Sequence, residues 1–321
     1  MKVFDGHSDI LMDVLVKSLI GERNIIEGYH IDKLRKGGVF LIVLPLWLDP
    51  EKREVARKNA LLTLDYLEGE LDESSHLIHR IIKYEDIGQG EAEGKIGIIL
   101  GMEGMFYIGK DLGWIEKFYQ RGIRTGSLTW NEENPLATGI WGDKNRGLTK
   151  LGREAMSLME DLGILLDVSH LNETSFWDVI RSTRGPVIAS HSNAYSLCPH
   201  PRNLKDEQII ELVRTGGLVG VNAWPDFLDV RDAKLTRLVD HIDYLVELVG
   251  INHVACGFDF CDFVEEDAPA SFPVKSKETE GFKDASYIQK LFLCLRDRGY
   301  GIEDMEKIAY KNLMRIYRRL L

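Results

Sequence analysis

Six histidines and carboxylates in this sequence end or directly follow short apolar segments. They are His7, Asp9, Glu103, His170, His191 and Asp259. Imidazole nitrogens and carboxylate oxygens are the donors that zinc takes in catalytic sites, and the same donors suit manganese or cobalt. The residue types therefore point to a metal site, provided that the fold brings them together.

The spacing of these residues favours two metal ions. His7 and Asp9 are two residues apart, so on an extended strand both side chains point to the same side and can bind one ion. His170 and His191 offer nitrogens for a second ion, and Glu103 has two oxygens with which to bridge the pair. A hydroxide held between two such ions is a nucleophile near neutral pH.

Each of these residues also has a more ordinary interpretation. A single histidine after a strand is more often a buried structural residue than a ligand, and Glu103 could cap a helix. Asp5 fits a structural carboxylate at the start of a strand better than a ligand. The metal site is predicted from the joint pattern. Five other histidines do not share this pattern and are expected to be structural or solvated; they are His30, His76, His79, His241 and His253.

Short segments rich in Val and Ile alternate with longer amphipathic segments, which is typical of parallel sheets built from βα units. The expected strands are residues 2–9, 38–48, 95–103, 123–130, 163–170, 186–191, 216–224 and 253–260. The expected helices are residues 51–69, 111–120, 150–162, 173–181, 206–214, 235–249, 284–298 and 303–320.

This alternation predicts one α/β domain, a (β/α)8 TIM barrel of the metal-dependent hydrolase type with C-terminal helices, over residues 1–321. A doubly wound open sheet is the alternative, but no GxGxxG follows the first strand. Barrel active sites form at the carboxyl ends of the strands, where all six candidate residues fall. Residues 262–283 are charged, contain two prolines and are expected as a loop at the barrel mouth.

The composition argues against nucleic acid and membranes as partners. A net charge of −11 repels nucleic acid and anionic lipid surfaces, but places no restriction on small neutral or zwitterionic substrates. No apolar run approaches the ~20 residues that span a bilayer. Because no secretory signal is visible, we expect a cytoplasmic protein. The four cysteines lack CxxC spacing and are expected to be reduced.

Six motifs carry a resemblance to a known family. DGHSD, GMEG, LLDVSH, IASHS, HPRNL and GFDF, in this order, resemble the membrane (renal) dipeptidase family of zinc peptidases, peptidase family M19 of the amidohydrolase superfamily. The resemblance extends from His7 to the KNLMRIYR stretch near the C-terminus. It implies a binuclear zinc dipeptidase in which a hydroxide bridges two zinc ions in each chain.

The resemblance also implies residue roles. His7 and Asp9 are similar to the ligands of the first zinc, His170 and His191 to those of the second, and Glu103 to the bridging carboxylate. Arg202, in HPRNL, is similar to the arginine that binds the dipeptide carboxylate, which agrees with the fit of a guanidinium to a carboxylate. Asp259 is similar to the acid that holds the free amino group and assists proton transfer to the leaving amine. Family members often accept a D-residue at the second position and commonly form homodimers, so a homodimer is implied here.

One position departs from the family pattern. Trp130, in SLTWNEENPLATG, stands where characterised members have a histidine that contacts the substrate, and an indole cannot act as an acid or base. Either that role is dispensable, or Asn131 or another loop residue supplies it. Two other hypotheses remain open: a different amidohydrolase activity, such as deacetylation or opening of a cyclic amide or lactone, and a non-catalytic barrel.

Overall fold

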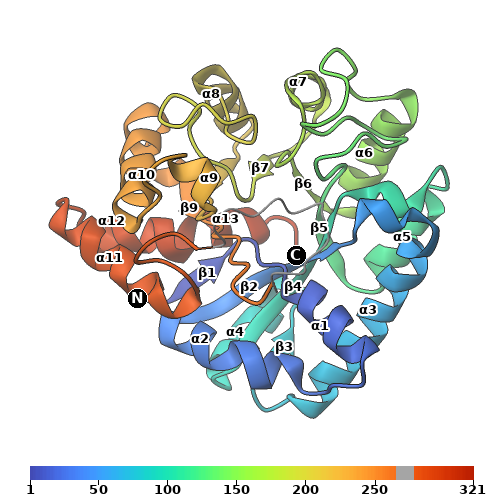
Figure 1. Cartoon of the computed structure of the whole chain (residues 1–321), viewed down its shortest axis with the longest axis horizontal. Coiled ribbons are helices and arrows are strands. Elements are labelled where there is room, and N and C mark those ends of the chain that lie inside the picture. Colours follow the sequence, from blue (N-terminus) through green and yellow to red (C-terminus); the bar gives the residue numbers. More distant parts are fainter. Residues whose placement is uncertain (265–277) are drawn as a thin grey trace.

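Parallel strands form a nearly closed central barrel in the computed structural model, which describes residues 1–264 and 278–321 (Figure 1). The barrel strands are β1 (Val3–Asp5), β2 (Val39–Trp47), β4 (Ile96–Glu103), β5 (Ile123–Ser127), β6 (Leu165–Asp167), β7 (Val187–Ala189), β8 (Leu218–Val221) and β9 (Val254–Cys256), hydrogen-bonded in that order. The first and last strands approach each other where the Gly6 N–H donates to the Cys256 carbonyl at 3.0 Å. This arrangement confirms the predicted (β/α)8 barrel.

Helices surround the barrel on its outside (Figure 1). They are α1 (Ile10–Leu19), α2 (Ile31–Gly37), α3 (Arg53–Glu73), α4 (Tyr84–Ala92), α5 (Gly113–Gln120), α6 (Lys150–Leu162), α7 (Glu173–Ser182), α8 (Asp206–Arg214), α9 (Pro225–Leu228), α10 (Leu235–Val249), α11 (Ile288–Asp297), α12 (Ile302–Glu306) and α13 (Asn312–Tyr317). Local sequence sets several ends: Thr149 caps α6 by accepting from the Gly152 N–H at 2.9 Å, and Gly163 ends it in the left-handed region.

The predicted strands are all present, but most are shorter than expected. Strand β1 ends at Asp5, so His7 and Asp9 lie in the following loop and at the start of α1, and the expectation that they share one face of a strand is wrong. Apolar residues continue beyond the hydrogen-bonded part of several strands, so these strands look longer in the sequence than they are in the structure. The structure also contains helices α1, α2, α4 and α9 and a short strand β3 (Ile78–Arg80) paired with β4, none of which was predicted.

The barrel interior is filled by apolar side chains, among them Phe4 of β1, Leu41 of β2, Ile99 of β4 and Ile188 of β7. The C-terminal helix α13 packs against this interior through Tyr317, whose ring centroid lies 5.3 Å from that of Phe4. Side chains thus close one end of the barrel. Strands β2 and β4 are buried almost throughout, as expected for parallel strands covered on both faces.

Part of the predicted mouth loop, residues 265–277 of 262–283, lies outside the described residues. Among the helices of residues 1–264 and 278–321, none combines the length and apolar character needed to cross a membrane.

Candidate metal centre

The six predicted chemical residues converge at the carboxyl ends of the barrel strands. Glu103 is the last residue of β4, while the loops after the other strands supply the rest. His7, Asp9, Glu103, His170 and His191 are each at most 6% exposed, and Asp259 is only slightly more open. Residues separated by up to 252 positions therefore share one buried cluster, as the barrel topology predicts.

The two oxygens of Glu103 face different histidines. Its Oε2 lies 3.4 Å from His7 Nε2, whereas its Oε1 lies 2.8 Å from His170 Nε2 and 3.4 Å from His191 Nε2. On the side of Glu103 that faces His7, Asp9 Oδ1 lies 3.8 Å from His7 Nε2. Glu103 thus stands between one His–Asp pair and one His–His pair.

The donor set fits divalent metal ions. Nε2 of His7 and Oδ1 of Asp9 are buried and make no hydrogen bond within the described residues. Three groups have ligand atoms that all lie within 4.8 Å of one another: the first is Glu103, His170 and His191, the second is His7, Asp9 and Asp259, and the third is His7, Asp167 and His191. Buried polar atoms without partners cost free energy, and bound cations would satisfy them.

The second group adds Asp259 to the possible ligands. Its Oδ1 lies 3.9 Å from His7 Nε2, so the structure places it beside the first predicted metal position. The sequence prediction gave Asp259 a substrate-binding and catalytic role only. From its position, the carboxylate can face both a metal ion and a substrate.

Burial and mutual proximity shift the pKa values within the cluster. Burial alone would lower the pKa of His7, but the facing carboxylates of Glu103 and Asp9 raise it to about 10. Burial lowers the pKa of His170 to about 3. Burial raises the pKa of Asp259 to about 6, against the opposing effect of His7. Such shifts are typical of functional sites, and a metal ion would replace the protons that this cluster otherwise needs.

Neighbouring side chains orient the histidine rings. Asn131 Oδ1 lies 2.7 Å from His170 Nδ1, and Ser190 Oγ lies 2.6 Å from His191 Nδ1. Ser190 Oγ also donates a short hydrogen bond to Asp167. Both rings consequently present Nε2 to the cluster, as metal-binding histidines do when a second group fixes Nδ1. Sequence reasoning missed Ser190 and Asp167, although both lie within the motifs LLDVSH and IASHS.

The backbone at the site is unusual. Three non-glycine residues of the described chain have positive φ, and two of them are His170 (71°) and Asp259 (60°). Left-handed conformations cost free energy in residues other than glycine and concentrate at functional sites. At both positions the chain turns sharply just after a strand, which directs the side chain into the barrel mouth.

Arg202 is 3% exposed and lies beside the cluster of predicted metal ligands. Its Nη2 donates to the His191 carbonyl at 3.1 Å, while its Nε has no hydrogen-bond partner within the described residues. Burial lowers its pKa to about 10, which still leaves the guanidinium charged near neutral pH. On the other side of the same carbonyl, the Asn222 Nδ2 donates to His191 O at 3.3 Å and to Asp259 Oδ2 at 3.0 Å.

A cavity of about 160 Å³ opens onto these residues. Five residues of the predicted site line it, together with apolar and further polar side chains: Asp9, Glu103, His170, Arg202 and Asp259 from the site, Trp130, Ile140, Trp141, Trp224 and Phe227 among the apolar ones, and Asn131, His200, Asp226 and Cys261 besides. This volume lies below the range of drug-sized ligand pockets, which favours a small substrate.

Trp130 lies in the wall of this cavity and is buried. Its ring centroid is 5.9 Å from that of His170 and 5.4 Å from that of Trp47. The indole therefore occupies space beside the cluster, and Asn131 contacts His170 Nδ1 instead. One alternative for this segment was that Asn131 or another loop residue replaces the histidine of the family pattern. The structure gives Asn131 a defined contact with the predicted site.

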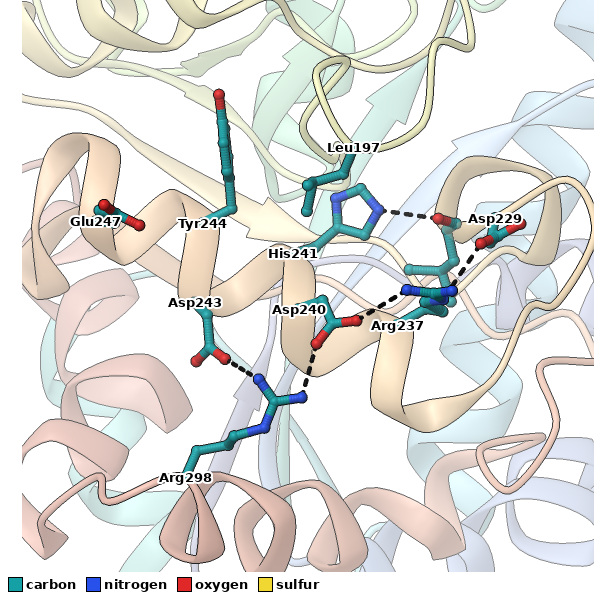
Figure 2. A pocket seen from close by; sticks show the side chains of 10 residues that line it. Leu197, Asp229, Arg237, Asp240, His241, Asp243, Tyr244, Glu247 and Arg298 are labelled. Atoms are coloured by element: carbon teal, nitrogen blue, oxygen red, sulfur yellow. Dashed lines mark hydrogen bonds and ion pairs between the residues drawn. The ribbon is translucent and has the colours of Figure 1, made fainter.

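A second hollow, of about 320 Å³, lies beside α10 (Figure 2). Its arginines are paired with acids: Arg237 with Asp229 and Asp240, and Arg298 with Asp240 and Asp243. It contains none of the predicted site residues.

Three of the histidines predicted to be structural make ordinary contacts away from the cluster. His30 pairs with Asp13 at 2.8 Å, and His253 Nδ1 lies 2.7 Å from the Gly217 carbonyl. His241, which is also buried, contacts the Leu228 carbonyl. Asp5 accepts hydrogen bonds from the Phe258 and His7 backbone N–H groups and so helps to hold the first and last strands together.

Comparison with known proteins gives a family match over almost the whole chain. The family model described as membrane dipeptidase (peptidase family M19) matches residues 1–320. A crystal structure of a metallo peptidase from Rhodobacter sphaeroides, liganded with a phosphinate mimic of the dipeptide L-Ala-D-Ala, superimposes with a TM-score of 0.88 at 26% identity. That match covers 100% of this chain and 99% of the other.

Two curated relatives are also similar in sequence. Dipeptidase aclJ of Aspergillus oryzae is 32% identical over 228 residues, which is 70% of this chain and 51% of the relative. A Klebsiella pneumoniae protein named for its position in the pqqA 5′ region is 35% identical over 223 residues, or 66% of this chain and 76% of the relative. The chain therefore spans about half the length of the Aspergillus protein.

Proposed function

The chain belongs to the membrane dipeptidase family (peptidase family M19), and we propose that it hydrolyses dipeptides with two zinc ions at the candidate metal centre. The observation that carries this proposal is the division of the Glu103 oxygens between His7 on one side and His170 with His191 on the other. A carboxylate that faces two groups of donors is suited to bridge two ions.

In this proposal His7 and Asp9 hold one ion, His170 and His191 hold the other, and Glu103 contacts both. Two zinc ions bound there would polarise the scissile carbonyl and supply a bridging hydroxide as the nucleophile. The protein's contribution is orientation, because Asn131 and Ser190 fix the rings of the second pair through their Nδ1 atoms.

Arg202 and Asp259 would recognise the two ends of the substrate. The buried Arg202 Nε without a partner supports binding of the terminal carboxylate, since a guanidinium donates two parallel hydrogen bonds to such a group. Asp259 accepts hydrogen bonds from the free amino group and assists proton transfer to the leaving nitrogen. Arg202 donates directly to the His191 carbonyl, and Asn222 donates both to that carbonyl and to Asp259. These contacts fix the positions of Arg202 and Asp259 relative to each other. A longer peptide could not engage both at once.

The ligand of the Rhodobacter sphaeroides relative supports testing a D-residue at the second position, because that ligand mimics L-Ala-D-Ala. The decisive experiment assays zinc-loaded protein on matched L-L and L-D dipeptides, with N-acetylated and C-amidated forms of each. We expect cleavage of the free dipeptides, strong loss with either blocked form, and no activity after chelation. Equal cleavage of the acetylated forms would instead favour another amidohydrolase activity and contradict the role given to Asp259.

A further inference from the structure

Trp141 is a large apolar side chain that is 55% exposed beside the cavity of the metal centre. A single exposed apolar residue needs no explanation, but this one shares the cavity with four other apolar side chains. They are Trp130, Ile140, Trp224 and Phe227. These five side chains form an apolar surface in part of a cavity that is otherwise lined by charged and polar residues, among them His200 and Asp226.

One wall of this surface is fastened to the metal centre. The Ile140 N–H donates to the His170 carbonyl at 3.1 Å, and the Trp141 N–H donates to the Asn131 carbonyl at 2.8 Å. The Trp130 ring meets the Trp141 ring edge to face at 5.0 Å. Backbone hydrogen bonds and ring packing thus fix the wall relative to His170.

Two glycines allow the chain to approach Trp130 closely. A Cβ on Gly139 would lie 2.2 Å from the Trp130 carbonyl oxygen, and a Cβ on Gly104 would lie 2.9 Å from the Trp130 Cβ. Gly104 also has a φ of 70°, which other residues adopt only with strain. The position of Trp130 is therefore built into the surrounding loops.

The second wall lies beside the predicted carboxylate-binding arginine. Arg202 Cζ is 5.4 Å from the centroid of the Phe227 ring, and that ring lies 6.3 Å from the Trp224 ring. In the order of the barrel, Trp130 and Trp141 follow β5, Trp224 and Phe227 follow β8, and the segment with Arg202 lies between them. Both walls line the same cavity as Arg202, so a residue whose carboxylate meets Arg202 would have its side chain within reach of them.

We propose that this cavity selects dipeptides whose carboxyl-terminal residue has a large apolar or aromatic side chain, with Trp141 as the specificity-determining residue. The inference rests on the proposed dipeptidase function and adds the substrate class. Contact with a side chain would remove the exposed face of Trp141 and the apolar part of the substrate from water, which favours binding in proportion to the area covered. Because Trp141 lies on the solvent side of the cavity, a long side chain does not have to fit inside it.

The test compares kcat/KM of zinc-loaded protein for L-Ala-L-Phe and L-Ala-L-Ala. We expect the wild type to favour the Phe dipeptide by roughly tenfold or more, the range that one apolar contact site gives. Trp141→Ala should lower this ratio by roughly tenfold, mainly through a higher KM for the Phe dipeptide, and Trp141→Phe should keep most of it. Trp177→Ala, in the outer helix α7, is the matched control and should leave the ratio unchanged.

Two results would overturn the inference, and they differ in what else they affect. Equal kcat/KM for both dipeptides in the wild type, or an unchanged ratio in Trp141→Ala, refutes the substrate class while the dipeptidase function stands. Failure of the wild type to cleave any free dipeptide refutes the proposed function and this inference together. Melting temperatures of all variants confirm that a changed ratio is not a folding defect.

Discussion

Asn131 Oδ1 lies 2.7 Å from His170 Nδ1, and this contact determines which nitrogen of the ring faces Glu103. A side-chain amide oxygen only accepts hydrogen bonds, so Nδ1 carries the proton and Nε2 keeps its lone pair. That Nε2 lies 2.8 Å from Glu103 Oε1, within the group of atoms that could hold an ion. Asn131 therefore acts on the metal centre through His170.

Removing this contact should weaken metal binding. We expect Asn131→Ala to lower zinc affinity by roughly 10- to 100-fold, as loss of a group that orients a ligand does, and Asn131→Asp to retain most of it because a carboxylate also accepts from Nδ1. Competition titration against a coloured chelator measures the change. Asn145→Ala, an exposed change in the same loop, is the control. Wild-type affinity in Asn131→Ala would show that His170 needs no such partner.

Glu103→Gln removes the charge that faces His7 on one side and His170 with His191 on the other. One amide oxygen cannot replace two carboxylate oxygens, so we expect fewer than two zinc ions per chain and a loss of kcat of roughly a hundredfold or more. Elemental analysis of purified protein gives the metal content, and dipeptide hydrolysis gives kcat. Glu116→Gln, on the exposed side of α5, should match the wild type in both. A Glu103→Gln protein with two ions and full activity would rule out a bridging role.

Arg202→Met keeps an unbranched apolar stem and removes the guanidinium. We expect the preference for free dipeptides over their C-terminal amides, measured as a ratio of kcat/KM, to fall by roughly a hundredfold, since a buried charged hydrogen bond to the substrate is lost. Arg181→Met, with an exposed arginine on α7, should preserve the preference. If Arg202→Met preserves it too, another residue binds the carboxylate.

The fold was predictable because parallel strands leave a strong apolar signal. Strands β2 and β4 are covered on both faces and appear as long apolar runs. Their exact ends were not predictable in the same way, because apolar residues continue into the loops. At His170 the backbone adopts a φ of 71°, a conformation that the sequence signals only when glycine occupies it.

The candidate ligands were predictable from residue type and placement, but their supporting contacts were not. Asp167, Ser190 and His191 form a chain of hydrogen bonds across two strands, and nothing in their spacing indicates it. Trp141 lies eleven positions beyond Trp130, and the packing of the two rings depends on the fold of the loop between them. Such contacts arise from the tertiary structure alone.

Removing the metal should destabilise the protein as well as inactivate it. Without ions, His7 Nε2 and Asp9 Oδ1 remain buried and lack hydrogen bonds within the described residues. We expect chelation followed by dialysis to abolish dipeptide hydrolysis and to lower the melting temperature by about 5 °C or more, because ligands that bind only the folded state stabilise it. Adding zinc should restore both. An unchanged melting temperature would mean that the centre holds no ion in the purified protein.

His241, in α10, is one of the residues that line the second hollow (Figure 2). The ring is buried, and burial lowers its pKa. The Ala194 N–H donates to its Nδ1 at 3.2 Å, and Nε2 lies 3.1 Å from the Leu228 carbonyl, so the neutral ring is the form that fits. Below the ordinary pKa of about 6.5 the unfolded chain takes up a proton that the folded chain resists, and the free energy of unfolding therefore falls as the pH decreases. Above that pH the group contributes no pH dependence.

Between about pH 7.5 and about pH 5.5, we expect the melting temperature of His241→Gln to fall by about 2 to 4 °C less than that of the wild type. His76→Gln, which changes an exposed ring, should follow the wild type. Identical pH profiles for His241→Gln and the wild type would show that His241 is not the group responsible.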